Sequence, residues 1–227
     1  MGKLILLRHG ASLWNEKNLF TGWVDIPLSS KGIEESLLAG QKIARITIDS
    51  IFVSSLIRAQ MTALLAMTMH EGGRIPRLMH TGEGKFEEWS KIYSPVTEKS
   101  CIPVYVAWQL NERMYGELQG MNKDEMRAQY GPDQVQVWRR SFDVAPPGGE
   151  SLKMTAARTI PYFQENIAAH VKQGKTVLIS AHGNSLRSIV MHLEHLSEEE
   201  VMKLEIATGA PVLYTYEQEK WQRGNLS

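Results

Sequence analysis

The stretch LILLRHG, residues 4–10, runs four apolar residues directly into an arginine, a histidine and a glycine. The stretch VLISAHG, residues 177–183, has the same plan. A short unbroken apolar run is typical of a strand that is buried on both faces of a parallel sheet. Because ligands of open α/β sheets bind at the carboxyl ends of the strands, we expect His9 and His182 to meet at one edge of a sheet.

Strand-like and helix-like patterns alternate along the rest of the chain. Strands are predicted at residues 4–7, 51–53, 77–80, 104–108, 176–180 and 212–217. Helices are predicted at residues 29–46, 57–70, 123–130, 134–140, 151–172 and 183–195, with a last short helix begun by a capping box of Ser197 and Glu200. The alternation predicts an α/β fold, a three-layer sandwich with a mostly parallel sheet covered by helices on both faces. Residues 10–28, and most of 71–102, are predicted to be loops. No linker separates two cores, so we expect a single domain over residues 1–227.

The composition argues against several classes of function. The 227 residues include 25 basic and 25 acidic side chains, whereas a general nucleic-acid binder carries a basic excess. The only cysteine, Cys101, can form neither an internal disulfide nor a zinc–thiolate cluster, and this fits a reducing compartment. No apolar run approaches the roughly 20 residues that a membrane span needs. We therefore expect a cytoplasmic protein with neither a nucleic-acid nor a membrane partner.

Arginines accompany both predicted histidines. Arg8 precedes His9, and Arg58 follows the strand predicted at residues 51–53. Guanidinium groups weaken a metal site but match the oxygens of a phosphate, and helix N-termini also attract anions. The pattern therefore predicts a metal-free phosphate site in which the neutral His9 imidazole attacks phosphorus and holds the phosphoryl group covalently. Arg8, Arg58 and a protonated His182 would neutralise the phosphoryl oxygens.

This hypothesis needs a proton donor and a close backbone turn. A carboxyl group must protonate the leaving hydroxyl, and Glu112, which follows a predicted strand at the same edge of the sheet, is the best candidate. Gly10 is interpreted as the residue that lets the backbone turn close to the bound phosphate.

Seven segments carry a resemblance to a known family. They are RHG…WN (8–15), FTGW-x-D-x-x-L (20–28), SSLIRA (54–59), NERMYGELQG (111–120), WRRSFD (138–143), PPGGESL (146–152) and AHGNSLR (181–187). Together they make the chain resemble the cofactor-dependent phosphoglycerate mutases of the histidine phosphatase superfamily. The resemblance implies a phosphoglycerate mutase-like fold and the interconversion of 2- and 3-phosphoglycerate. It also implies a phosphohistidine primed by 2,3-bisphosphoglycerate, no metal cofactor and room for a homodimer.

The resemblance assigns roles residue by residue. His9 matches the phosphorylated histidine, Glu112 the proton donor and acceptor, and His182 the histidine that stabilises the transferring phosphoryl group. The phosphate-pocket positions are matched by Arg8, Asn15, Arg58, Gly183 and Asn184. The positions that hold the substrate's carboxylate and distal phosphate are matched by Thr21, Gly22, Arg113, Tyr115, Lys123, Arg139 and Arg140. The chain departs from the family at Ala11, where Glu or Gln is usual, and at Met114, where His is usual. We therefore expect one polar group fewer near the pocket.

Two other functions stay open at this stage. A histidine phosphatase would pass the phosphoryl group to water and hydrolyse small phosphate monoesters. A catalytically silent binding module would have no need of the complete set of histidines, arginines and the carboxylate. Retention of Arg113, Lys123 and Arg139–Arg140 favours the mutase, because a general phosphatase does not read a carboxylate and a second phosphate. Arg187 is interpreted as a helix-surface or structural residue, outside the site.

Overall fold

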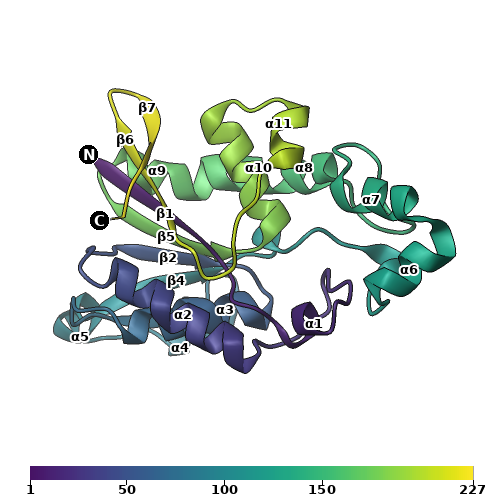
Figure 1. Cartoon of the computed structure of the whole chain (residues 1–227). Coiled ribbons are helices and arrows are strands. Elements are labelled where there is room, and N and C mark those ends of the chain that lie inside the picture. The colour runs from purple at the N-terminus through teal and green to yellow at the C-terminus, as the bar shows by residue number, and fades with distance from the viewer. Residues whose placement is uncertain (227) are drawn as a thin grey trace.

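The computed structural model describes residues 1–226 and arranges them around one seven-stranded sheet (Figure 1). The strands in chain order are β1 (Gly2–Arg8), β2 (Ser50–Val53), β3 (Ile75–Leu78), β4 (Cys101–Val106), β5 (Thr176–Ala181), β6 (Val212–Glu217) and β7 (Lys220–Gly224). Their order across the sheet is β3-β4-β2-β5-β1-β6-β7. The strands from β3 to β1 are parallel, and β6 and β7 add an antiparallel hairpin at one edge. The predicted domain includes Ser227, which lies outside the described residues.

Helices cover both faces of the sheet, which confirms the predicted α/β sandwich. The helices of eight or more residues are α2 (Ser30–Ile43), α3 (Ile57–Thr68), α6 (Lys123–Tyr130), α7 (Pro132–Arg140), α8 (Leu152–Tyr162) and α10 (Gly183–Glu194). The shorter ones are α1 (Leu13–Glu16), α4 (Lys85–Trp89), α5 (Pro95–Lys99), η1 (Trp108–Leu110), η2 (Gly116–Leu118), η3 (Phe163–Ile167), α9 (Ala168–Lys172) and α11 (Glu198–Lys203). α2 and α3 lie on one face of the sheet, α8 and α10 lie on the other, and α6 and α7 lie beyond the carboxyl ends of the parallel strands (Figure 1). None of the helices within residues 1–226 has the length and apolar character to span a bilayer.

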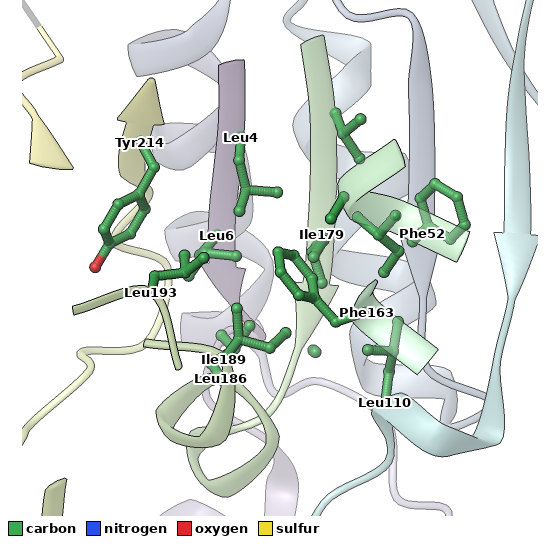
Figure 2. Packing of buried hydrophobic residues seen from close by; sticks show 14 of the residues in the cluster. Leu4, Leu6, Phe52, Leu110, Phe163, Ile179, Leu186, Ile189, Leu193 and Tyr214 are labelled. Carbon is green, nitrogen blue, oxygen red and sulfur yellow. The ribbon is translucent and has the colours of Figure 1, made fainter. Parts of the chain in front are cut away.

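The alternating side chains of β1 divide the core between these two faces. Leu4 and Leu6 pack with Phe163 and with the apolar side of α10, as Figure 2 shows. Ile5 and Leu7 pack on the opposite face, among buried residues of α2 and α3. Because both faces are buried, a shift of β1 by one residue would exchange the two sets of side chains. The core therefore fixes the register of β1 against its neighbours.

The helix predicted before β5 and the strands at the end of the chain differ in detail from the sequence prediction. The helix predicted over residues 151–172 is confirmed in extent but is not a uniform α-helix, because the π-helix η3 follows α8 at Phe163 and α9 continues to Lys172. Pro161 lies in the last turn of α8, where its ring displaces the preceding turn and its missing N–H interrupts the hydrogen-bond ladder. β7 was not predicted. It pairs with β6 across a turn at Gln218 and Glu219, which both have left-handed φ angles.

Two segments predicted to be largely loop contain helices. Residues 71–102 hold α4 and α5, and β3 begins at Ile75 rather than at residue 77. Residues 10–28 hold α1, whose N-terminus is closed by a capping box between Ser12 and Asn15. β4 is also displaced from the prediction: it spans Cys101–Val106, and η1 follows.

The register of β1 against β5 brings the two histidines together. Arg8 pairs with Ala181, and the His9 N–H donates to the Ala181 carbonyl at 3.0 Å. Both histidines therefore follow the last paired residues of neighbouring parallel strands.

The structure shows a packing reason for Gly10, whose φ angle is not positive. A Cβ atom at Gly10 would lie 2.2 Å from the Gly32 carbonyl oxygen, in the backbone of α2. Gly10 is needed because the loop after β1 touches α2 backbone to backbone.

Candidate active site

His9 lies buried at the end of β1 and faces His182, with their ring centroids 4.9 Å apart. The His9 Nδ1 atom is 2.7 Å from the Gly10 carbonyl oxygen, which can only accept a hydrogen bond. The ring proton of the neutral imidazole therefore sits on Nδ1, and Nε2 keeps its lone pair. Burial, and then the positive charges of Arg58 and Arg8, hold the pKa of His9 well below its usual range. His9 is thus a neutral base with its Nε2 lone pair available.

His182 is the N-cap of α10 and is fully buried. Its Nε2 atom is 2.7 Å from the Ser54 Oγ atom, which already accepts the Leu56 N–H. If the Ser54 hydroxyl donates to Nε2, the ring proton of neutral His182 lies on Nδ1. Burial, followed by the charge of Arg58, holds the pKa of His182 well below its usual range. His182 is therefore neutral in the site without phosphate, and its protonation during phosphoryl transfer stays a prediction.

A cavity of about 230 Å³ opens at this edge of the sheet. Of the predicted site residues, the structure places these on its wall: Arg8, His9, Asn15, Thr21, Gly22, Arg58, Glu112, Tyr115, Lys123, Arg139, Arg140, Gly183 and Asn184. The structure does not bring Arg113 to the wall: it is buried behind Tyr115, with its Nη2 atom donating to the Tyr115 hydroxyl and to the Arg139 carbonyl. His182 lies beneath His9.

The positive charge of the cavity has two centres. Arg8 and Arg58 lie beside the histidines, and Arg58 is fixed by donating to the carbonyls of Gly22 and Val24. The second centre is on α6 and α7, where burial and the neighbouring arginines lower the pKa of Lys123 to about 8. Burial also lowers the pKa of Arg58 to about 10. Cations held in this state bind an anion strongly, because the anion removes their mutual repulsion.

The Glu112 carboxylate is held by one oxygen. Its Oε1 atom accepts the Arg113 N–H at 2.7 Å, the Asn184 N–H at 3.2 Å and the Asn184 side-chain amide at 2.7 Å. All three bonds end on Oε1, so Oε2 is the oxygen left to exchange a proton with a ligand.

Sequence reasoning missed four residues of the cavity wall: Leu19, Phe20, Arg187 and Glu205. The placement of Arg187 outside the site is wrong, because it lies on the cavity wall. It is buried rather than on the helix surface, and it also has structural contacts, donating to the Leu204 carbonyl and the Asn184 side chain. Glu205 forms ion pairs with Arg140 and with Arg187. A signal existed for Arg187, which lies one helical turn after Gly183 on the same helix. Glu205 follows no motif.

The two departures from the family lie outside the cavity wall. The Ala11 N–H donates to the Glu35 carboxylate at 2.8 Å, so the backbone after the nucleophile still contacts an acidic side chain. The Met114 N–H donates to the Glu150 carboxylate, and the Met114 carbonyl accepts the Glu150 N–H. The expected loss of one polar group near the pocket stays a prediction.

The site also presents unpaired polar atoms. Buried atoms without a hydrogen-bond partner in residues 1–226 include Arg8 Nε, Thr21 Oγ1 and His182 Nδ1. Buried donors are normally paired, so these atoms fit a ligand that is rich in acceptor oxygens. Across the described chain, no group of three or more His, Cys, Asp and Glu side chains is arranged to hold a metal ion.

We expect the ligand-free protein to lose stability as the pH falls below 6.5. His9 and His182 have folded-state pKa values below the ordinary 6.5, so the unfolded chain binds more protons than the folded one in that window. Stability from these groups is complete above 6.5 and declines by about 1.4 kcal/mol per pH unit for each histidine below it. Urea unfolding at several pH values measures the slope, and His9→Ala should reduce it. An unchanged slope in that variant would contradict the buried neutral state.

Comparisons with known proteins agree with this geometry. Residues 4–92 and 90–226 match the model of the histidine phosphatase superfamily (branch 1). A Protochlamydia amoebophila 2,3-bisphosphoglycerate-dependent phosphoglycerate mutase is 62% identical over 97% of this chain and 98% of its own length. The enzyme of that name from Chlamydia pneumoniae is 56% identical over 98% of this chain and 97% of its own length. Among solved structures, a mycobacterial glucosyl-3-phosphoglycerate phosphatase has a TM-score of 0.76 at 22% identity, covering 98% of this chain and 97% of its own, and so supports the fold alone.

Proposed function

The chain belongs to the 2,3-bisphosphoglycerate-dependent phosphoglycerate mutases, within branch 1 of the histidine phosphatase superfamily, and from this premise we propose how its site works. The reaction is the interconversion of 2- and 3-phosphoglycerate, an isomerisation of glycolysis and gluconeogenesis. The observation that carries the assignment of residues is the cavity itself. Its wall carries the neutral His9, Glu112, Arg8 and Arg58 together with further cations from α6 and α7.

His9 and Glu112 perform the two halves of the transfer. The His9 Nε2 lone pair forms a bond to phosphorus as the bond to the ester oxygen breaks, and Glu112 gives that oxygen a proton. In the opposite transfer the phosphoryl group passes from Nε2 of the primed His9 to the free hydroxyl of a phosphoglycerate, whose proton Glu112 takes. A bisphosphoglycerate therefore links the two transfers, and attack on its other phosphate restores the phosphohistidine and releases the isomeric phosphoglycerate. Arg8, Arg58 and the Nδ1–H of His182 neutralise the phosphoryl oxygens during both transfers.

The residues present fit the cofactor that names the family. 2,3-Bisphosphoglycerate supplies the phosphoryl group that primes His9. The unpaired Arg8 Nε and His182 Nδ1 atoms suit phosphate oxygens at one end. The second phosphate and the carboxylate would be held by Thr21, Tyr115, Lys123, Arg139 and Arg140. Arg113 would act behind them by orienting the Tyr115 hydroxyl.

The second cationic centre favours transfer between phosphoglycerates over hydrolysis. A phosphatase for simple monoesters needs only the charges of Arg8 and Arg58 beside His9. The charges on α6 and α7 have a use when the substrate carries further anionic groups away from the reacting phosphate. Such groups hold the organic product in place until the second transfer, which keeps water from taking the phosphoryl group.

We expect purified protein to convert 3-phosphoglycerate to 2-phosphoglycerate in EDTA when 2,3-bisphosphoglycerate is added. The chain's own arginines and lysine, rather than a metal ion, neutralise the transferring group. Phosphorus NMR separates 2-phosphoglycerate from inorganic phosphate in one sample. A requirement for Mn²⁺, or inorganic phosphate as the only product, would contradict the proposal and favour the phosphatase alternative.

Three finer points belong to the same proposal. A glycolytic reaction places the protein in the cytoplasm, which the single cysteine also favours. One sheet ties together all seven strands, which supports a single domain over residues 1–227. The family resemblance allows a homodimer, which analytical ultracentrifugation of the purified chain would detect.

A further inference from the structure

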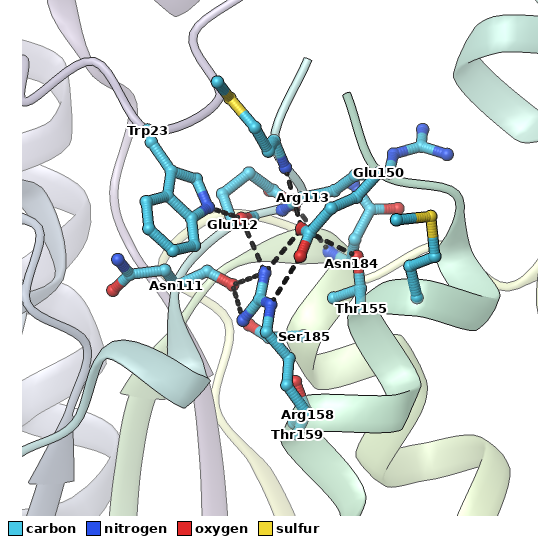
Figure 3. Close-up of polar contacts among 12 residues, drawn as sticks. Trp23, Asn111, Glu112, Arg113, Glu150, Thr155, Arg158, Thr159, Asn184 and Ser185 are labelled. Carbon is cyan, nitrogen blue, oxygen red and sulfur yellow. Dashed lines mark hydrogen bonds and ion pairs between the residues drawn. The ribbon is translucent and has the colours of Figure 1, made fainter. Parts of the chain in front are cut away.

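Arg158, on α8, is the most heavily bonded side chain next to the site, yet it does not line the cavity. Its side chain is 10% exposed. Its guanidinium donates to both carboxylate oxygens of Glu150, at 2.9 Å and 2.8 Å. It also donates to the carbonyls of Gln109 at 2.8 Å, Asn111 at 3.1 Å and Glu112 at 2.9 Å, as Figure 3 shows in part. The mechanism proposed above uses none of these contacts.

The Arg158–Glu150 pair is fully satisfied. Besides Arg158, the Glu150 carboxylate accepts the Met114 N–H at 3.0 Å and the Thr155 hydroxyl at 3.4 Å. Burial alone would raise the pKa of Glu150, but the hydrogen bonds from Arg158 and Met114 hold it below its usual range. Removing one partner of such a pair would leave the other charge buried without compensation. The Arg158–Glu150 pair therefore stays formed and acts as a rigid anchor.

The segment that this anchor holds has little regular structure of its own. Between η1 and η2 the chain passes through Asn111 and Glu112 in neither a helix nor a strand. Side chains bond the carbonyls here instead: Trp23 Nε1 donates to the Glu112 carbonyl at 2.5 Å, and the Thr159 hydroxyl donates to the carbonyl of Gln109, in the preceding η1, at 2.9 Å. The Arg158 guanidinium lies 5.4 Å from the centroid of the Trp23 ring, so the two side chains that bond the Glu112 carbonyl also contact each other.

We propose that Arg158 is a positioning residue that sets the Glu112 carboxylate at the distance and angle needed for proton transfer. The inference rests on the proposed function, because Glu112 has to exchange a proton there. Glu112 is held at two points: Arg158 and Trp23 fix its carbonyl, and Asn184 fixes Oε1. Loss of the hydrogen bonds to the Glu112 carbonyl would let the carboxylate rotate about its hydrogen bond to Asn184. The planar guanidinium is needed because it reaches a carboxylate and three carbonyls at once, which a lysine ammonium cannot do.

The first test compares Arg158→Met and Arg158→Lys with Lys153→Met, a matched loss of charge at an exposed position of α8. We expect Arg158→Met to lower kcat about 100-fold with KM for 3-phosphoglycerate changed less than threefold. Arg158→Lys, which can still pair with Glu150, should fold and lower kcat less. Calorimetry with inorganic phosphate should give the wild-type Kd for both variants. Lys153→Met should behave as wild type. A rise in KM with unchanged kcat would overturn the proposal.

The second test is a double-mutant cycle with Glu112→Gln, read out as the rate of ³²P transfer from 2,3-bisphosphoglycerate to His9. If Arg158 acts through Glu112, adding Arg158→Lys to Glu112→Gln should slow transfer less than threefold further. Multiplication of the two separate losses would overturn the proposal, because it would mean an independent structural role. The final yield of phosphohistidine should equal that of wild type in every variant that folds. Failure of the mutase assignment is distinguishable, because wild-type protein would then form no 2-phosphoglycerate.

Discussion

Replacing His9 with alanine is expected to leave a folded protein without measurable mutase turnover. Loss of a covalent nucleophile removes the reaction path itself, and in other enzymes it costs on the order of 10⁶-fold in kcat. His9 is the expected nucleophile because its Nδ1–H is committed to the Gly10 carbonyl and its Nε2 lone pair is not protonated near neutral pH. The measurement is turnover of 3-phosphoglycerate together with acid-labile ³²P on the protein.

The control for this variant is His192→Ala, a half-buried histidine later on α10. It should keep both turnover and labelling, since it lies outside the cavity wall. Acid-labile label that persists in His9→Ala would contradict the assignment and would direct attention to His182, whose ring is the nearest alternative.

Glu112→Gln is expected to lower kcat by roughly 10²–10⁴-fold, the usual contribution of general acid–base catalysis. The glutamine side chain has the same shape, and its carbonyl oxygen can still accept from Asn184, so the backbone and the cationic centres should stay in place. What is lost is the proton that Oε2 would give to the leaving alkoxide. KM should therefore change little while the rate of His9 phosphorylation falls.

The matched control for Glu112→Gln is Glu117→Gln, a change on η2 outside the cavity wall. It should leave the rate of His9 phosphorylation near that of wild type. A loss smaller than threefold in Glu112→Gln would contradict its role. The other carboxylate on the cavity wall, Glu205, would then be the next candidate for the proton donor.

The fold was predictable because its central strands are unambiguous. The unbroken apolar runs of β1 and β5 have only one plausible environment, a strand covered on both faces, and the structure buries them in that way. The region around residues 71–102 was not predictable, since α4 and α5 are single-turn helices with no buried residue among them. Without a buried face there is no period for a sequence pattern to reveal.

The composition of the site was more predictable than its electrostatic state. Sequence motifs identify side chains, and nearly all of those predicted line one cavity. Motifs do not tell how deeply a group is buried, and burial is the main cause of the lowered pKa of His182 in the site without phosphate. Arg113 lies off the cavity wall and Arg187 lies on it, the reverse of what the motifs indicated. The residue type alone does not tell which arginine reaches the cavity.

The pairing of β1 with β5 has a consequence for how the protein is made. During synthesis β1 appears long before either of its neighbours in the sheet, β5 and β6. Until then its apolar residues and both of its hydrogen-bonding edges have no native partner, a state that favours association with other chains. Pairing of strands that are so far apart in the sequence is also slow. The ribosome-bound chain should therefore depend on chaperones until residues 176–217 emerge, and catalytic competence should appear abruptly at that point.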